Sequence, residues 1–342
     1  MGDEVILLAD GGGGERMMDL VRREILSRFA PAGGGGELAR LADAARLEPG
    51  DGALAFTTDS YVVRPLEFPG GDIGRLAVCG TVNDLAVCGA APRAISLALV
   101  IEECLAVATL ERIVESVAAA AREAGVPVAT GDTKVVERAR GDGLTITTAG
   151  VGERLAGAER LDAARIEGGE AVLVSGPIAE HGLAVMSARK GIAFRTVIRS
   201  DAAPLNGLVA ALLASGADVR FLRDPTRGGL AGVLADLAET TRRNIELDEQ
   251  AVPLTAAARH ASELLGLDAL AIANEGKVVI VAAAGDAEKV LAACRAHPLG
   301  RGAALVGRVG DRSDWPLVEL LTAVGGRRIV QRPYGEELPR IC

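Results

Sequence analysis

Aromatic residues, histidine and cysteine are all scarce in this chain of 342 residues. Trp, Tyr and Phe make up 2% of it, and there are three histidines and five cysteines. The cysteines form neither a Cys-x-x-Cys pair nor the mixed Cys/His spacing of a zinc site, which excludes a zinc-finger protein. Because 49% of the side chains are hydrophobic, the expected core is large, aliphatic and divided between two domains.

A surplus of positive charge is also missing. Lys and Arg total 37 against 46 for Asp and Glu, so the formal net charge is -9. This sign disfavours binding to nucleic acid or to an anionic membrane, whereas an excess of carboxylates suits metal ions. The first residues have no basic region and only a short apolar run. We therefore expect neither a signal peptide nor a spanning helix, and a cytoplasmic protein.

The cysteines fall into two groups. Cys79, Cys88, Cys104 and Cys294 stand among Ala, Val and Leu and are interpreted as small buried apolar residues. Cys342 differs, because it follows the polar stretch "PYGEELPRI". If extended, the segment from Tyr334 onward spans roughly 30 Å at about 3.3 to 3.6 Å per residue, so its thiol could move between a partner's site and an internal one.

Glycine-rich and polar stretches divide the chain into parts. Two tetraglycine runs bracket a short amphipathic segment, and a polar stretch after residue 154 precedes a new strand-like run. The expected parts are a glycine-rich mobile arm (1–36), a first α/β domain (37–154), a linker (155–168), a second α/β domain (169–332) and a mobile tail (333–342).

Apolar patterns place the main elements. The expected strands cover 53–59, 94–101 and 144–151 in the first domain and 171–176, 277–283, 304–310 and 327–331 in the second. Apolar residues at helical spacing over 110–121 predict a helix that Gly125 closes, and a second-domain helix follows "RDPTRGG". The fold class is therefore α/β.

A helix with two polar residues is expected between Asp72, its N-cap, and Gly89, its stop signal. Its residues are apolar nearly all round, except for Asn83 and Asp84. A carboxylate buried in such a helix costs several kcal/mol unless a cation or strong donors offset it. The alternatives are that Asn83 and Asp84 form a satisfied buried pair, or that one of them is the N-cap of a later helix.

Three further acids occupy comparable positions. Asp43 lies in "LADAARL", Asp59 ends an expected strand, and Asp224 lies in a turn before a helix. Mg²⁺ takes oxygen ligands and is usually shared between a few carboxylates and substrate phosphates, so a convergence of these acids would suit it. Each of them could equally be an ordinary turn or capping residue.

Two glycine-containing stretches are candidates for phosphate binding. "ATGDTKVV" combines Gly131 with Asp132, Thr133 and Lys134, although a surface lysine in a turn is the default alternative. In "DPTRGGLAGVL", Gly228 and Gly229 leave backbone N–H groups bare at a helix start, where the helix dipole favours anions. Neither stretch is a Walker A loop.

These segments resemble the HypE family of hydrogenase maturation proteins. The resemblance rests on "FTTDSYVVRPLEFPGGDIGRLAVCGTVNDLAVCGA", "GDTKVVERARGDGLTITTAGVG", "RDPTRGGLAGVL", "ANEGK" and "PRIC". It implies a carbamoyl dehydratase with the two-domain aminoimidazole ribonucleotide synthetase-like fold, which binds ATP and Mg²⁺ and dimerises through its first domain.

The resemblance also implies a reaction and partners. HypF would transfer a carbamoyl group to Cys342, and ATP would phosphorylate the carbamoyl oxygen. Loss of phosphate and of the nitrogen protons would leave a thiocyanate, whose cyanide would reach the iron of a nickel-iron hydrogenase through a HypC–HypD scaffold. ATP is needed because an amide oxygen is a poor leaving group and phosphate a good one.

The residue roles follow from the same resemblance. It implies metal ligands at Asp43, Asp59, Asp84 and Asp224, and nucleotide-binding residues at Thr58, Asp59, Asn83, Gly131, Asp132, Thr133, Gly228 and Gly229. Cys342, Lys134, Glu275 and Asp84 would be catalytic, with Glu275 as the candidate general base. The alternative for Glu275 is an ion pair with Lys277. The sequence departs from the family at Asp10, where a histidine is expected, and its three histidines receive no role.

Two other functions remain open at this stage. A selenophosphate synthetase or a thiamine-monophosphate kinase would share the acidic ATP site, but the first needs a cysteine or selenocysteine in the glycine-rich arm, and none precedes Cys79. A non-enzymatic maturation scaffold is the other alternative. The retention of Asp84, Lys134 and Glu275 argues against a degenerate site.

Overall fold

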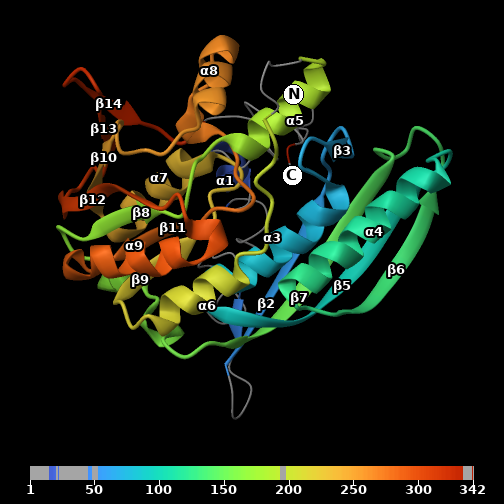
Figure 1. Ribbon diagram of the computed structural model, residues 1–342, viewed down its shortest axis with the longest axis horizontal. Coiled ribbons are helices and arrows are strands. Elements are labelled where there is room, and N and C mark those ends of the chain that lie inside the picture. The colour runs from blue at the N-terminus through green and yellow to red at the C-terminus, as the bar shows by residue number, and fades with distance from the viewer. Residues whose placement is uncertain are drawn as a thin grey trace, which may run out of the picture.

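The structure, a computed structural model, describes residues 15–20, 22, 45–47, 53–192, 198–333 and 341. Two α/β lobes lie side by side, and helix α3 (Ile73–Val87) runs toward the junction between them (Figure 1). The N-terminal lobe contains one five-stranded sheet and the C-terminal lobe one seven-stranded sheet. None of the helices among the described residues is both long and apolar enough to cross a membrane.

The N-terminal sheet has the order β1-β2-β7-β5-β6. Its strands are β1 (Ala45–Leu47), β2 (Leu54–Tyr61), β5 (Ala90–Glu102), β6 (Val128–Val136) and β7 (Leu144–Arg154). A short hairpin of β3 (Glu67–Phe68) and β4 (Gly71–Asp72) lies before α3. All neighbours in the large sheet are antiparallel except β5 and β6, which α4 (Val107–Ala124) connects in parallel.

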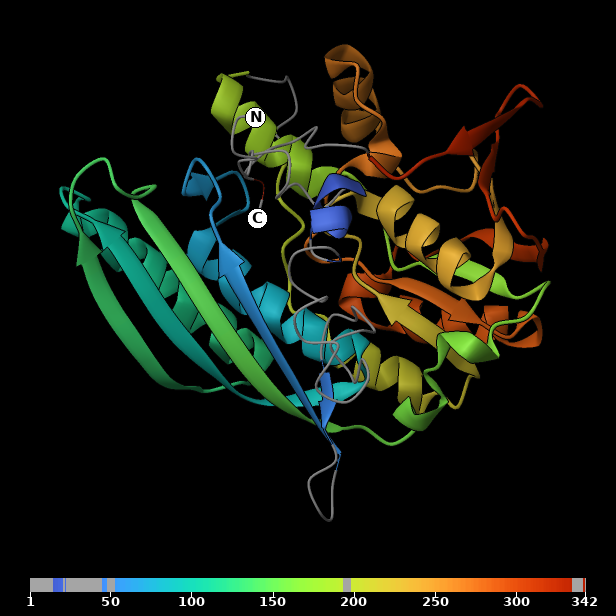
Figure 2. The same cartoon turned by 180° about the vertical axis from the view of Figure 1, so that it is seen from behind.

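Both helices of this lobe cover the same face of its sheet. Figure 2 shows the strands from the opposite side, with the helices behind them. Residues alternate between the two faces along each strand. The face away from the helices carries the partly exposed apolar side chains Phe56, Val100 and Val151. Among the described residues, no element packs over this outer face of the sheet.

Helix α3 begins and ends where the sequence predicts. The Asp72 carboxylate accepts hydrogen bonds from the N–H groups of Gly74 and Arg75, and Gly89 has a left-handed φ of 79° just past the end. Helix α4 likewise ends at Gly125, in the left-handed conformation. Nearly every residue of α3 is buried, because the N-terminal sheet covers one side of it and α4 and α6 (Asn206–Ala214) cover the others.

The C-terminal sheet has the order β14-β13-β10-β12-β8-β11-β9. Its strands are β8 (Ala171–Val174), β9 (Val219–Arg223), β10 (Arg243–Asp248), β11 (Val279–Ala282), β12 (Ala304–Arg312), β13 (Val318–Leu321) and β14 (Arg327–Val330). Helices α6 and α9 (Ala287–Ala296) pack on one face of this sheet, and α7 (Gly229–Thr241) packs on the other.

Helices α5 (Glu180–Lys190) and α8 (Ala256–Leu265) pack together above this sheet. Of the predicted N-terminal arm, α1 (Glu15–Leu20) and Arg22 are described. Glu15 of α1 lies 3.6 Å from Arg332 near the end of the second domain. Helix α1 covers six residues of the amphipathic segment expected in the arm, and most of that segment lies outside the described residues.

Asn83 joins the two lobes through three hydrogen bonds. Its side-chain N–H group donates to the carbonyls of Ala203 and Glu275, at 3.1 Å each, and its Oδ1 accepts from the N–H of Leu205 at 2.7 Å. The side chain is completely buried. Because a buried amide that loses such partners is costly, Asn83 fixes how α3 sits against the C-terminal lobe.

One sequence-based expectation, the burial of four cysteines, needs correction. Cys104 is exposed, because it lies in the turn between β5 and α4 with a φ of 76°, and Cys88 is only partly buried. Cys79 and Cys294 are buried as expected. In the segment expected to be a linker, Leu161 and Ile166 are buried against the C-terminal lobe, and its role as a linker stays a prediction. Of the segment expected to be a mobile tail, 334–340 and Cys342 lie outside the described residues, Ile341 is 2% exposed, and the mobility of the tail stays a prediction.

Candidate active site

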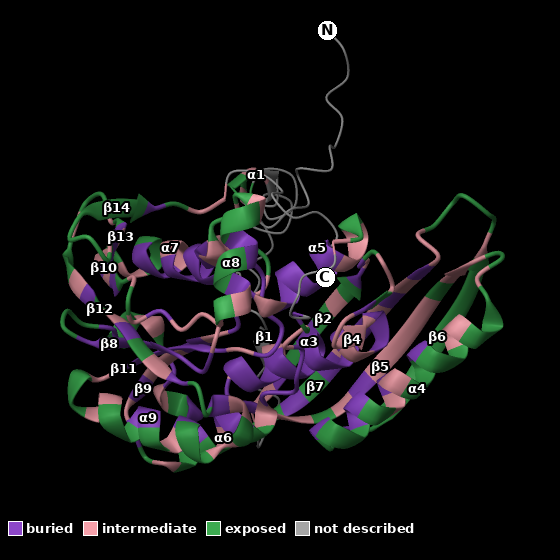
Figure 3. Cartoon of the chain, turned by 45° about the horizontal axis from the view of Figure 1, so that its top comes forward, coloured by how far each residue is buried: buried purple, intermediate pink, exposed green. Residues whose placement is uncertain are grey.

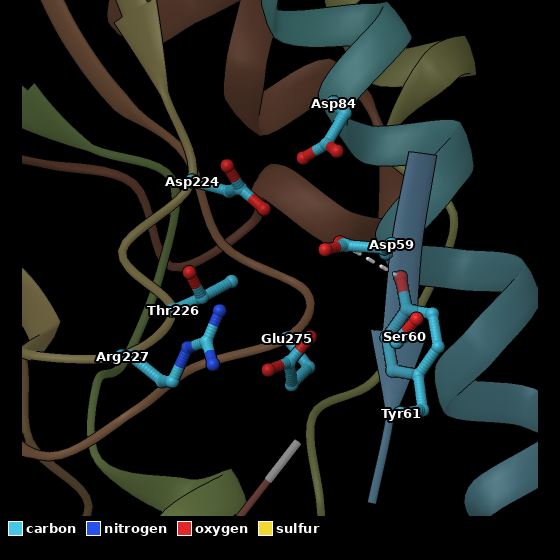
Figure 4. A pocket seen from close by; sticks show the side chains of 9 residues that line it. Asp59, Ser60, Tyr61, Asp84, Asp224, Thr226, Arg227 and Glu275 are labelled. Atoms are coloured by element: carbon cyan, nitrogen blue, oxygen red, sulfur yellow. Dashed lines mark hydrogen bonds between the residues drawn. The ribbon is translucent and has the colours of Figure 1, made fainter. Parts of the chain in front are cut away.

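A pocket rich in carboxylates lies where the two lobes meet. It is lined by Asp59, Ser60, Tyr61, Gly80, Asp84, Asp224, Thr226, Arg227 and Glu275. Figure 4 shows that the side chains of Asp59 and Asp84 approach it from β2 and α3, whereas Asp224 and Glu275 approach it from loops of the other lobe. The expected convergence of Asp59, Asp84 and Asp224 on one place is therefore present.

The carboxylate of Asp59 is held by a hydrogen bond from Tyr61, two residues further along the same strand. The Tyr61 hydroxyl donates to Asp59 Oδ2 at 3.1 Å, and Tyr61 is itself buried. Gly80 makes this possible, because a Cβ at that position would lie 2.2 Å from the Tyr61 hydroxyl. Burial raises the pKa of Tyr61 well above its ordinary value, and the carboxylates of Asp59 and Asp84 raise it further, so the phenol remains a hydrogen-bond donor.

Asp84 and Asp224 differ in their surroundings. The hydroxyl of Thr57, on the helix-facing side of β2, donates to Asp84 Oδ2 at 2.8 Å. Asp224 follows β9 and is 4% exposed. Both carboxylates thus come from the ends or faces of rigid elements. That support suits them to hold a charged ligand in one geometry.

Glu275 is the most deeply buried acid of the pocket, at 1% exposure. Its backbone is fixed on both sides, because its N–H donates to Asp201 Oδ1 at 3.1 Å and its carbonyl accepts from Asn83. Its Oε1 atom is buried without a hydrogen-bond partner among the described residues. Burial, reinforced by Asp224, Asp201 and Asp59, raises the pKa of Glu275 well above its ordinary value, whereas Arg227 opposes this shift.

The alternative in which Glu275 pairs with Lys277 is wrong. Lys277 Nζ lies 3.0 Å from Asp201 Oδ2, and both side chains are nearly buried. Glu275 and Lys277 both lie in the loop before β11 (Val279–Ala282), and the side chain of Lys277 reaches Asp201 and not Glu275. The lysine thereby neutralises Asp201 and leaves Glu275 without a neighbouring lysine partner. This arrangement is what a general base with a raised pKa requires.

Thr226 and Arg227 are pocket residues that the sequence analysis did not select. They lie in "RDPTRGG", directly before the glycines at which the sequence predicts phosphate binding. Arg227 is the one basic residue that lines the pocket in the described part of the chain. Its guanidinium faces the carboxylates in Figure 4, as an anion-binding group between acids would.

The structure explains why glycine is required at the two positions of that turn, and the explanation is not phosphate binding. Gly228 and Gly229 have left-handed φ values of 82° and 60°, and a Cβ on Gly229 would lie 2.5 Å from the carbonyl of Leu270. The N–H of Gly229 already donates to the Thr226 carbonyl at 2.9 Å. Chain reversal and close packing therefore account for both glycines, and their binding of phosphate stays a prediction.

The "GDTK" residues do not join the pocket within one chain. They lie on β6, an edge strand at the far side of the sheet from β2, and all four are exposed (Figure 3). Lys134 Nζ donates to Asp132 Oδ1 at 3.0 Å. A Cβ on Gly131 would lie 2.3 Å from the Leu97 carbonyl, so close strand pairing explains this glycine. The segment is a strand and not the turn considered as an alternative.

The remaining candidates are placed as follows. Thr58 is exposed on the outer face of the sheet, where its hydroxyl donates to the Thr148 carbonyl at 3.0 Å. Asn83 joins the lobes and does not line the pocket. Asp10, Asp43 and Cys342 lie outside the described residues. The nucleotide-binding roles of Thr58 and Asn83 stay predictions.

The pocket fits a cation that is bound jointly with phosphates. Three aspartates and a buried glutamate face one arginine in it. Within the described ranges, no three His, Cys, Asp or Glu side chains form a preformed metal cage. Mg²⁺ normally takes one or two carboxylates, several waters and substrate phosphates, so an open set of aspartates is the donor set expected for it.

Comparison with known proteins identifies the family to which this two-lobed architecture corresponds. Residues 41–154 match the N-terminal domain of AIR synthase related proteins, and residues 167–315 match the C-terminal domain. The carbamoyl dehydratase HypE of Rhizobium leguminosarum bv. viciae is 52% identical over 293 residues, which cover 85% of this chain and 83% of that protein. The resemblance seen in the sequence is therefore confirmed.

Solved structures of HypE proteins have the same fold as this chain. A HypE–HypF complex contains a chain that is 44% identical, with a TM-score of 0.84, covering 92% of this chain and 99% of that one. A HypE in complex with ATP is 42% identical, with a TM-score of 0.81 and coverage of 98% and 100%. A thiamine-monophosphate kinase from Aquifex aeolicus, at 18% identity and a TM-score of 0.63, shares the fold alone.

The burial of the Glu275 carboxyl group predicts a pH-dependent stability. Its folded pKa is raised, so the native state holds a proton that the unfolded state releases above the ordinary value of 4.5. In metal-free protein, the free energy of unfolding should fall as pH rises from there through the folded pKa, by at most about 1.4 kcal/mol per pH unit. Glu275→Gln should remove this slope.

The measurement is denaturant unfolding of both proteins in chelator across this range. Glu263→Gln, at an exposed position on α8, is the control and should keep the wild-type profile. Parallel profiles for the wild type and Glu275→Gln would show that Glu275 is ionised in the native state throughout, contrary to its burial.

Proposed function

The chain belongs to the HypE family of carbamoyl dehydratases, and we propose that it uses ATP to convert an S-carbamoyl group on its own Cys342 into a thiocyanate. One observation carries the proposal: acids from both lobes converge on one pocket, and one of them, Glu275, has a raised pKa. The 42% identical HypE solved with ATP supports the nucleotide.

The proposed reaction balances as a dehydration. The carbamoyl oxygen attacks the γ-phosphorus of ATP and releases ADP, and the C–O bond then breaks to release phosphate. Two protons leave the nitrogen as the C≡N triple bond forms. The oxygen of the carbamoyl group ends in phosphate, so ATP hydrolysis drives an otherwise unfavourable loss of water.

Glu275 suits the removal of these protons. A carboxylate with a raised pKa is a stronger base than an exposed one, and its unpartnered Oε1 atom is an available acceptor. Its backbone bonds to Asp201 and Asn83 hold it in place. The charge of Arg227 favours phosphate groups at the same pocket.

Mg²⁺ is the proposed metal. Asp59, Asp84 and Asp224 would hold it, with Asp43 as a further predicted ligand. When bound, it would supply positive charge that neutralises the phosphate oxygens. The hydrogen bonds to Asp59 and Asp84 from Tyr61 and Thr57 orient these carboxylates in advance.

The proposed partners follow the chemistry of the thiol. We infer that HypF supplies the carbamoyl group, in line with the solved complex of a HypE with HypF. A HypC–HypD scaffold is the proposed acceptor of the cyanide. The reaction is placed in the cytoplasm, where ATP is supplied.

A homodimer is proposed through the outer face of the N-terminal sheet. Phe56, Val100 and Val151 expose 42%, 37% and 39% of their surface there, an apolar face that a second copy could bury. The strand register places Lys134 beside Val100 on the same face. Ser60 lies on that face and also lines the pocket, so Lys134 of the partner subunit could reach the phosphates that Lys134 of the same chain does not approach.

Kinase activity on thiamine monophosphate has weaker support. The likeness to thiamine-monophosphate kinase shows the fold alone, at 18% identity, and such an activity would leave the terminal "PRIC" segment without a role. A selenophosphate synthetase would require a nucleophile in the glycine-rich arm that the sequence lacks.

Cys342→Ala should abolish both carbamoylation and cyanation, because no acceptor thiol remains, while ATP binding and thermal unfolding stay unchanged. Intact-mass measurement after incubation with HypF, carbamoyl phosphate and ATP detects both adducts. Cys104→Ala removes the exposed cysteine of the described region and is the control, which should be modified normally. Modification that survived in Cys342→Ala would place the acceptor elsewhere.

Asp84→Asn should allow carbamoylation and block dehydration, because it weakens the metal and phosphate site without touching the thiol. We expect the single-turnover rate of thiocyanate formation to fall by roughly 100-fold or more, as for a lost electrostatic group at a reaction centre. Asp314→Asn, on an exposed loop, should behave as wild type. A normal dehydration rate in Asp84→Asn would remove Asp84 from the metal site.

Subunit mixing tests whether Lys134 acts across the dimer. Lys134→Ala and Asp84→Asn should each be inactive alone. After unfolding and refolding together, half of the dimers are mixed, and each has one intact site if Lys134 acts on the other chain, which restores about a quarter of wild-type activity. If Lys134 acts within its own chain, mixing restores nothing, and sedimentation separately reports whether a dimer forms.

A further inference from the structure

His181 makes buried contacts that the proposed reaction does not use. It lies in the first turn of α5, is completely buried, and meets the ring of Phe68 edge-on at 5.5 Å between centroids. Its Nδ1 lies 2.8 Å from the Ser200 hydroxyl. Its Nε2 lies 2.9 Å from the backbone carbonyl of Ile341, the residue immediately before Cys342.

The surroundings of His181 select one tautomer. The Ile341 carbonyl can only accept, so Nε2 carries the proton and donates. Nδ1 must then accept from the Ser200 hydroxyl, whose oxygen in turn accepts from the N–H of Ala202 at 3.1 Å. Burial lowers the pKa of His181, which keeps the ring neutral in this arrangement.

The side chain of Ile341 reinforces the contact. It is 2% exposed and belongs to a buried apolar cluster that includes Phe68, Val185, Met186 and Ala273. One hydrogen bond and one buried aliphatic side chain therefore hold this residue. Both features are specific, because the bond requires a donor at Nε2 and the cluster requires an apolar side chain at the position before the cysteine.

The same region is bonded to the segment that carries Glu275. The N–H of Gly182, next to His181, donates to the Ala273 carbonyl at 3.1 Å. The N–H of Ala179 donates to Asn274 Oδ1 at 2.7 Å. The start of α5 thus fixes Ala273 and Asn274, which directly precede Glu275 in the chain, and it holds Ile341 at the same time.

We propose that His181 is a positioning residue that docks the tail at Ile341 and thereby presents the adjacent Cys342 derivative to the acid pocket. Adjacent Cα atoms are about 3.8 Å apart, so anchoring Ile341 confines the next residue to a small volume. The proposal deepens the proposed function and rests on it for the identity of the group presented. The docking itself does not depend on that function.

The docking is tested by histidine NMR. The chain has three histidines, so uniform ¹⁵N-histidine labelling gives few signals. His181 should show the Nε2–H tautomer, and a chain ending at Arg340 should shift its Nε2 signal while those of His260 and His297 stay in place. An Nδ1–H tautomer, or a His181 signal that ignores the loss of Ile341, overturns the docking.

The positioning role is tested by separating two steps. His181→Phe keeps a ring against Phe68 but removes both nitrogens, and His181→Gln keeps an N–H donor. Each variant is first carbamoylated with HypF and carbamoyl phosphate. It is then purified, and ATP and Mg²⁺ are added to start a single turnover that intact mass follows. His260→Phe, at an exposed position on α8, is the matched control.

His181→Phe should be carbamoylated at the wild-type rate but dehydrated roughly five- to tenfold more slowly, as for the loss of one buried hydrogen bond. His181→Gln should recover most of the rate, and Ile341→Ala should reproduce the defect. Equal losses in carbamoylation, dehydration and thermal stability would instead mean a purely structural role. An unchanged dehydration rate in His181→Phe would also overturn positioning.

The two measurements separate the possible failures. A wild-type protein that never forms thiocyanate contradicts the proposed function, yet the NMR result still decides whether the tail docks at His181. If His181→Phe fails to fold, Ile341→Ala and the chain ending at Arg340 carry the same tests without altering α5.

Discussion

The burial of helix α3 on all sides is the constraint on which the rest of the structure depends. A helix that packs against a sheet, against α4 and against the other lobe has no solvent face on which to place polar residues. Its polar residues near the C-terminal end must therefore find partners on neighbouring elements, as Asp84 does with the hydroxyl of Thr57 on β2. Asn83 meets this requirement with three hydrogen bonds to the C-terminal lobe, and Asp84 faces the pocket. The lobes are thus fixed against each other at the place where the acids meet.

The pocket gathers more negative charge than the protein neutralises. Lys277 compensates Asp201, and Arg227 lines the pocket, but Glu275 stays buried among Asp59, Asp201 and Asp224 with its pKa raised. Such an arrangement destabilises the folded state when no cation is present. The same charges would favour a bound metal ion and give Glu275 its basicity. The fold loses stability at this pocket because its carboxylates are arranged to bind a cation and not to neutralise one another.

The features that the sequence could predict are those that depend on interactions between residues close together in the chain. The caps of α3, Asp72 and Gly89, act through bonds between near neighbours, and strand alternation turns Asp59 and Tyr61 inward on β2. The convergence of Asp59, Asp84, Asp224 and Glu275 could be expected only from the family resemblance, because it depends on the packing of two lobes. The pairing of Lys277 with Asp201, 76 residues apart, was beyond local reasoning altogether.

The glycines are difficult to interpret from the sequence for another reason. A glycine can be required by a turn, by close packing or by a bound phosphate, and the sequence does not distinguish these causes. The sequence predicts phosphate binding at Gly131 and Gly229, yet the carbonyls of Leu97 and Leu270 would lie within 2.5 Å of a Cβ at these residues. A sequence shows that a side chain is missing but not which atom occupies its space. His181 stands in no triad-like setting in the sequence, because its partners, Ser200 and the backbone of Ile341, are 19 and 160 residues away.

A tail that is both substrate carrier and part of the fold must bind weakly. The tether keeps the local concentration of Cys342 high, so little affinity is needed to dock it and the binding energy can serve orientation. In the proposed function, a tight anchor would prevent the thiol from reaching HypF and the cyanide acceptor. One hydrogen bond from His181 and one aliphatic side chain are of the right strength for this exchange, since each is worth only a few kcal/mol or less. In the proposed function, the roughly 30 Å that a segment of this length spans when extended would let the same thiol serve two places in turn.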